Sequence, residues 1–74
     1  MAGTDREIIR LLVTAGDEPV ATSAIADELG ISHPGAWRRL EKLAAAGIVK
    51  RQVDGDAMGD LWLLTAEARD EFRE

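Results

Sequence analysis

Five basic side chains lie in a central part of the chain where Glu41 is the only acidic residue. They are Arg38, Arg39, Lys42, Lys50 and Arg51. Residues 31–53 therefore carry +4 (five basic, one acidic), whereas residues 1–30 carry −4 (two basic, six acidic) and residues 54–74 carry −5 (two basic, seven acidic). An arginine can donate two hydrogen bonds to guanine O6 and N7, and lysine and arginine bind phosphates. This distribution predicts a nucleic-acid-binding surface in a chain whose net charge of −5 would otherwise argue against one.

Two short helices joined by a tight turn are predicted to position these side chains. Thr22 as an N-cap and Gly30 as a left-handed C-cap predict a helix over residues 23–29. Ser32 as an N-cap and Pro34 in the first turn predict a second helix over residues 33–46, which ends before Gly47. Such a short connection forces the two helices to cross at a steep angle.

The second helix has an apolar side and a side suited to contact, at about 100° per residue. Three apolar residues cluster on the side that we expect to be buried: Ala36, Leu40 and Leu43. Arg38 points away from them, flanked by Gly35 and Lys42 on one side and by Trp37 on the other, while Arg39 lies nearer the buried edge. The alternatives are a solvated helix whose arginines provide only solubility, and core packing for Trp37.

The remaining elements complete one domain over residues 1–74. Thr4 and Glu7 form a capping box for a helix over residues 4–15, in which Ile9 and Val13 widen the apolar surface beyond one face. The sequence predicts two strands, over residues 48–53 and 60–64, and a last helix over residues 66–73. Pro19 and Val20 form a short extended segment that could add an edge strand to the sheet. We expect an α+β fold, mainly α, with a three-helix core, a two- or three-stranded sheet and a short C-terminal helix.

The acidic turn between the two strands suggests calcium as an alternative. Asp54, Asp56 and Asp60 have the spacing of oxygen ligands, but Met58 and Thr65 stand where an EF-hand needs an oxygen ligand and a bidentate glutamate. We therefore expect no metal site.

Composition excludes several other functions. The chain has no cysteine and His33 is its only histidine, so neither a thiolate metal site nor a catalytic constellation is visible, and we expect neither an enzyme nor a cofactor. The sequence contains no run of about 18 apolar residues, which a membrane-spanning helix would need, and its N-terminus has no apolar signal region. We expect a cytoplasmic protein.

The motifs ADELGIS, A-x-R-R-L-x-x-L-x-x-x-G-I-V and L-W-L-L-T-x-E resemble the winged helix-turn-helix domains of bacterial and archaeal transcription regulators. The chain is similar to small phage-repressor-like regulators of halophilic archaea and, more distantly, to the MarR and ArsR groups. The resemblance makes residues 54–60 a wing, whose acidity departs from the usual basic pattern. The composition, with 14 Asp and Glu but only two lysines, also resembles halophilic proteins.

These patterns predict a sequence-specific regulator of transcription that binds double-stranded DNA, expected to be a repressor, with its second helix in the major groove. Arg38 would bind a base edge, Gly35 and Trp37 would meet bases or sugars, and His33 would contact a phosphate or base edge. The expected phosphate ligands are Ser32, Arg39, Lys42, Lys50 and Arg51. We expect a homodimer, whose interface would use the first helix, Leu61 and Leu63, or the last helix. The alternative is a winged module that docks a basic protein partner.

Overall fold

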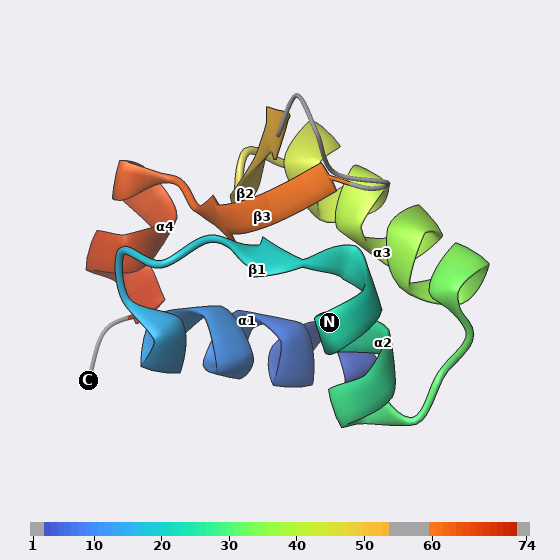
Figure 1. The fold of residues 1–74 in the computed structure, drawn as a ribbon. Helices are drawn as coiled ribbons and strands as arrows, with labels where there is room; N and C mark the ends of the chain where they lie inside the picture. The colour runs from blue at the N-terminus through green and yellow to red at the C-terminus, as the bar shows by residue number, and fades with distance from the viewer. Residues whose placement is uncertain (1–2, 54–59, 73–74) are drawn as a thin grey trace.

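The computed structural model describes residues 3–53 and 60–72, which form four helices and three strands (Figure 1). In chain order they are α1 (Gly3–Ala15), β1 (Val20–Ala21), α2 (Thr22–Leu29), α3 (His33–Ala45), β2 (Val49–Val53), β3 (Asp60–Leu64) and α4 (Ala66–Phe72). The predicted fold class is confirmed: the protein is α+β and mainly helical. The predicted turn with Asp54 and Asp56, and the last residue of the predicted C-terminal helix, lie outside the described residues.

The three strands form an antiparallel sheet in the order β1-β3-β2. The short strand after Pro19 pairs at the edge, with Val20 opposite Trp62, and β2 pairs along the whole of β3. In Figure 1, α1 runs beneath the sheet and contacts β3, α2 and α4, while α3 contacts α2 and β2. The sheet and α2 thereby hold α3 at one side of the molecule.

The core lies where the inner faces of the helices meet the sheet. Its largest fully buried side chains are Ile8, Leu12, Thr22, Ile25, Leu40, Trp62 and Leu64. Alternation along β3 places Trp62 and Leu64 in this core and leaves Leu61 and Leu63 half-buried on the other face of the sheet.

The apolar surface of α1 is used within the chain. Ile9 is 4% exposed and Val13 is partly buried against the core, so the prediction that they widen a surface for a second copy is wrong for Ile9. The physical reason is that α1 is surrounded by α2, β3 and α4, and a helix with several neighbours buries more than one face.

Two predicted N-caps are also wrong. Helix α1 begins at Gly3, so Thr4 lies within its first turn. Helix α2 begins at Thr22 itself, after Ala21, which makes no side-chain cap bond. Because β1 leads directly into α2, the Thr22 side chain turns toward β3 instead of toward its own helix.

Candidate nucleic-acid interface

The turn between α2 and α3 fixes where α3 begins. Gly30, at φ 67°, takes the left-handed conformation that ends α2, and the amide of Ile31 donates to the Ala26 carbonyl at 3.0 Å. The Ser32 hydroxyl accepts a hydrogen bond from the Gly35 amide at 3.1 Å and so caps α3. A Cβ at residue 35 would lie 2.9 Å from the Ser32 oxygen, so glycine leaves room for this cap.

The outward side of α3 carries the predicted contact residues. Ala36, Leu40 and Leu43 are buried, which confirms the predicted inward side of the helix. Arg38 and Lys42 are exposed, and so is His33 at the start of the helix. Arg38 and Lys42, four residues apart on the outward side, and His33 at the start of the helix are therefore open to solvent.

Arg39 faces another part of the protein. Its Nη1 lies 3.5 Å from Oδ1 of Asp5 in the first turn of α1, with the two side chains 42% and 23% exposed. Arg39 thus lies toward the edge of α3, as the helix geometry predicts, and its charge is partly balanced by Asp5. The residual exposure leaves part of its guanidinium accessible to a phosphate.

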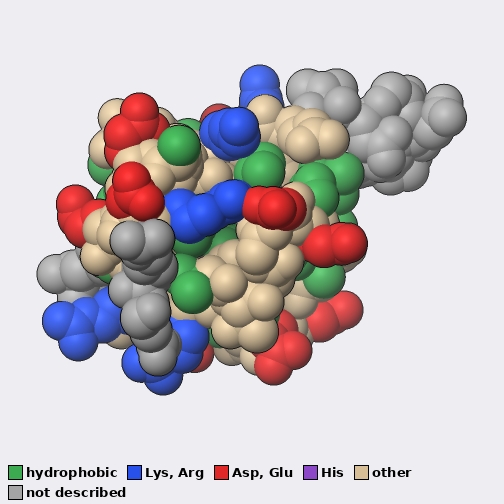
Figure 2. All heavy atoms as spheres, turned by 90° about the vertical axis from the view of Figure 1, so that its left-hand side faces the viewer, with side chains coloured by type: hydrophobic (Ala, Val, Ile, Leu, Met, Phe, Trp, Pro, Cys, Tyr) green, Lys and Arg blue, Asp and Glu red, His purple; other side chains and the backbone are tan. Residues whose placement is uncertain are grey.

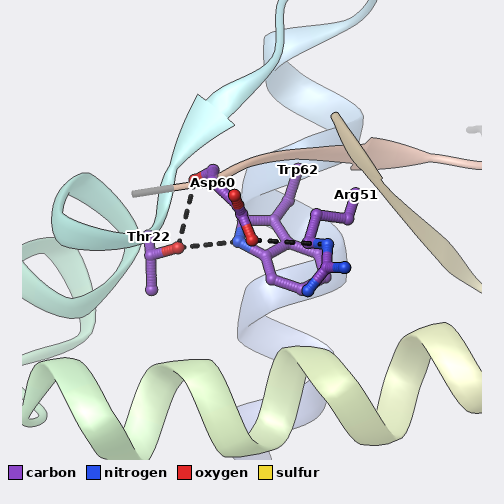
Figure 3. A network of polar contacts seen from close by, with 4 residues as sticks. All are labelled: Thr22, Arg51, Asp60 and Trp62. Carbon is purple, nitrogen blue, oxygen red and sulfur yellow. Dashed lines mark hydrogen bonds and ion pairs between the residues drawn. The ribbon is translucent and has the colours of Figure 1, made fainter. Parts of the chain in front are cut away.

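Arg51 lies at the junction between the sheet and α3. Its Nε forms an ion pair with Oδ2 of Asp60 at 3.3 Å across the β2–β3 pair (Figure 3). Its Cζ lies 5.7 Å from the centroid of the Trp37 ring, within the range of a cation–π contact. The strand and the helix thus hold one guanidinium from two directions.

Trp37 is anchored to the core by a second tryptophan. Its ring meets that of Trp62 edge to face, with centroids 5.4 Å apart and an interplanar angle of 77°. Trp62 Nε1 donates to the Thr22 hydroxyl at 2.7 Å, and that hydroxyl donates to the Asp60 carbonyl at 3.1 Å (Figure 3). Half-buried Trp37 therefore joins core packing to the predicted interface.

Lys50 does not join Arg51. In the β2–β3 register Arg51 is opposite Trp62, on the face that meets α3, whereas Lys50 is opposite Leu63. Successive residues of a strand point to opposite faces, so the exposed Lys50 lies on the far face of the sheet. The sequence placed the two charges together, and the pleat separates them.

The face that bears α4 carries a mixture of side-chain types. Figure 2, which views the molecule from the side of α4, shows hydrophobic side chains dispersed among Lys or Arg and Asp or Glu side chains. Arg69 of α4 pairs with Asp17 and donates to the Gly16 carbonyl at 3.2 Å, so α4 is tied to the end of α1. Across residues 3–53 and 60–72, no helix is long and apolar enough to cross a membrane, and no cluster of three potential metal ligands occurs.

A family model described as a helix-turn-helix domain matches residues 2–52, which include α2, the turn and α3. The chain belongs to this helix-turn-helix family. No curated protein matches it. Solved structures with the same fold include ZitR of Lactococcus lactis, described as a zinc-responsive MarR family member (26% identity, TM-score 0.77, covering 92% of this chain and 46% of ZitR). The complex of S. aureus MepR with DNA gives a TM-score of 0.86 at 17% identity, and covers 95% of this chain and 57% of MepR.

These comparisons establish the winged helix-turn-helix fold, with α2 and α3 as the helix pair and β2 and β3 as the strands of the wing. The MepR likeness, at 17% identity, shows the fold alone. The chain spans about half the length of the ZitR and MepR structures.

Sequence reasoning missed three residues of the helix-turn-helix interface. Asp5 and Asp60 each hold one of its arginines, and Thr22 supports the tryptophan behind them. The only available signal for Asp60 was its place at the start of a predicted strand opposite a predicted basic strand. For Asp5 no local signal existed, because its partner is 34 positions away (39 minus 5).

Proposed function

We propose that the protein is a sequence-specific regulator of transcription that binds double-stranded DNA through α3. The observation that carries this proposal is the outward side of α3, where Arg38 and Lys42 are exposed on a helix whose opposite side is fully packed. The helix-turn-helix family and the likeness in fold to a protein solved with DNA support it. In this geometry the second helix of the pair enters the major groove.

Each predicted residue has a role in this proposal. Arg38 binds a base edge, because it lies farthest from the core, and Gly35 lets a sugar or base approach the helix closely. Lys42 and Arg39 bind phosphates on either flank, and His33 and the Ser32 end of α3 meet the strand near the helix N-terminus. Trp37 contributes mainly by supporting Arg51. Lys50 adds long-range attraction only, because it lies on the far face of the sheet.

Binding of duplex DNA followed by fluorescence anisotropy tests the proposal. A selection from random duplexes gives the preferred site, and Arg38→Ala is expected to relax preference at one position, at a cost of about 1–3 kcal/mol there. Lys42→Ala is expected to weaken binding to all DNA sequences alike. It should also reduce by about 0.9 the magnitude of the salt slope, which is the slope of the logarithm of the binding constant against the logarithm of the salt concentration. Glu41→Ala, on the same helix, is the matched control and should bind at least as well as the wild type. Unchanged binding in both basic-to-alanine variants would refute the proposal.

We further propose that the protein represses transcription as a homodimer, because a single α3 offers few base contacts. Half-buried Leu61 and Leu63 on the outer face of the sheet, together with α4, support a contact between copies. Analytical ultracentrifugation of the chain with and without a palindromic site tests this proposal. A strictly monomeric chain bound one per site would contradict it.

A halophilic archaeal origin is proposed from the acidic, lysine-poor composition. Self-repulsion among 14 acidic side chains should loosen the domain in dilute buffer, and salt should relieve it. The melting temperature is expected to rise from dilute buffer to about 1 M potassium chloride, where the Debye length falls to about 3 Å. A melting temperature that does not rise would contradict the proposal.

A further inference from the structure

The guanidinium of Arg51 is held by residues from two other elements. Asp60 on β3 pairs with its Nε at 3.3 Å, and the Trp37 ring on α3 lies beneath its Cζ at 5.7 Å. The Trp37 ring is itself fixed edge to face against buried Trp62. The position of Arg51 relative to α3 is therefore set by the folded protein before any ligand binds.

The ion pair with Asp60 leaves the terminal nitrogens of the Arg51 guanidinium available to a ligand. Asp60 contacts Nε, the nitrogen nearest the side-chain stem, and the Arg51 side chain remains 47% exposed while Asp60 is only 19% exposed. The terminal nitrogens of an arginine form a planar fork that fits a phosphate. A flexible arginine loses much rotamer freedom when it binds, and prior fixation removes part of that loss.

We propose that Asp60 and Trp37 are positioning residues that hold Arg51 ready to bind a backbone phosphate of the DNA that α3 engages. This inference rests on the proposed function and deepens it. The acidic residue at the base of the wing thereby assists DNA binding, although its own charge repels DNA.

The sign of the Asp60 effect separates this proposal from simple electrostatics. If Asp60 acts only through its charge, its removal strengthens DNA binding, as does removal of any other exposed carboxylate. If Asp60 positions Arg51, its removal weakens binding, and only while Arg51 is present. A double-mutant cycle of Asp60 and Arg51 therefore distinguishes the two explanations, because they predict opposite changes in DNA affinity when Asp60 is removed.

Random-sequence duplex DNA is the probe, because a phosphate contact contributes to binding at any sequence. Anisotropy titrations between about 50 and 200 mM salt compare Asp60→Ala, Asp60→Asn, Arg51→Ala and the double variant with the wild type. Asp27→Ala, at an exposed carboxylate of α2, controls for charge, and Lys50→Ala controls for loss of a cation one residue away on the other face. Circular dichroism melts establish that each variant is folded at the temperature of the titration.

Arg51→Ala is expected to weaken binding about tenfold and to lower the salt slope by about 0.9, with a smaller loss for Lys50→Ala. Asp60→Ala is expected to weaken binding about 3- to 10-fold, whereas Asp60→Asn, which keeps an oxygen for Nε, stays within about twofold of the wild type. In the Arg51→Ala background, Asp60→Ala should no longer weaken binding.

Two results would overturn the inference. If Asp60→Ala strengthens binding as Asp27→Ala does, or weakens it equally with and without Arg51, Asp60 does not position Arg51, and the proposed function stands as long as Arg38→Ala still relaxes specificity. If Asp60→Ala does not fold, the DNA affinities of Asp60→Asn and Arg51→Lys are compared with that of the wild type instead. Arg51→Lys keeps the positive charge but has no guanidinium, so equal affinity of Arg51→Lys and the wild type refutes a role for the held guanidinium. A wild-type chain that binds no duplex removes both proposals.

Discussion

Replacing Thr22 with valine tests the buried link between α2 and the sheet. Thr22 is 0% exposed and Trp62 is 1% exposed, so neither the Trp62 Nε1–H nor the hydroxyl that it meets at 2.7 Å can turn to water. Valine has nearly the same shape, so the change removes the hydroxyl and leaves no cavity. Trp62 then keeps a buried donor without a partner, and the Asp60 carbonyl loses a donor at 3.1 Å.

A buried donor left unpaired costs about 1–3 kcal/mol. A 74-residue domain has a total stability of about 4–11 kcal/mol, so the change removes a large fraction of it. At roughly 4–8 °C per kcal/mol for a domain of this size, a loss of about 2 kcal/mol lowers the melting temperature by roughly 8–16 °C. Urea unfolding followed by circular dichroism gives the free energy directly.

Matched variants separate this account from helix capping. Thr14→Val removes a hydroxyl that donates to the Arg10 carbonyl at 3.0 Å on an exposed helix face, and should change stability by less than about 0.5 kcal/mol. Thr22→Asp would preserve an N-cap, but here it buries a carboxylate and should destabilise more than valine does. The reasoning is refuted if Thr22→Val unfolds as Thr14→Val does, or if Thr22→Asp is as stable as the wild type.

Two further substitutions test the ends of the helices. Gly35→Ala should not stabilise the protein, because the added Cβ displaces the Ser32 hydroxyl that caps α3. In the Ser32→Ala background the same change should stabilise the protein by about 0.5–1 kcal/mol, since no cap remains to be displaced. Equal gains in the free energy of unfolding in both backgrounds, measured by urea unfolding, would contradict this. Arg69→Met should change the free energy of unfolding by less than about 1 kcal/mol, because Asp17 is 91% exposed and the Nε of Arg69 is buried without a partner. A loss of several kcal/mol on Arg69→Met would show that the pair is a main anchor of α4.

The orientation of α3 could be predicted because it depends on local geometry. The angle between successive helical residues puts Ala36, Leu40 and Leu43 together whatever they pack against, and the structure buries all three. The turn chemistry of Gly30 and Ser32 is equally local, and both residues act as expected. The fold class followed from these elements and the alternating strand that ends in Leu64.

The predictions for Thr22 and Ile9 failed because they depended on distant partners. A threonine before a helical pattern is a good N-cap on local grounds, but Thr22 meets Trp62, which is 40 positions away. Ile9 was predicted to extend the apolar surface of α1 beyond the one face that packs on the core. The number of elements that surround α1 cannot be inferred from the sequence of the helix itself. Charge pairs between distant elements have the same property: nothing near Arg39 in the sequence indicates that Asp5 of α1 will pair with it.

The DNA contacts remain predictions, and their residues differ in how the structure prepares them. Arg38 and Lys42 are exposed on the outward side of α3, whereas Arg39 and Arg51 are paired with carboxylates. An arginine that is already paired must share or exchange its partner when a phosphate arrives, so its contribution to affinity depends on geometry more than on charge. Counting basic residues therefore overstates the number of independent phosphate contacts.

Backbone amide NMR during titration with duplex DNA tests the central claim most directly, because it reports where DNA binds without any substitution. If α3 is the DNA-binding element, the largest shifts will lie along α3, from its N-terminal end through Arg38 to Lys42 in its last turn, and at Arg51 on β2. Amides of α4 and of the middle of α1 should stay nearly unchanged. Shifts confined to α1 and α4, or a spectrum that duplex DNA leaves unaltered, would contradict the account.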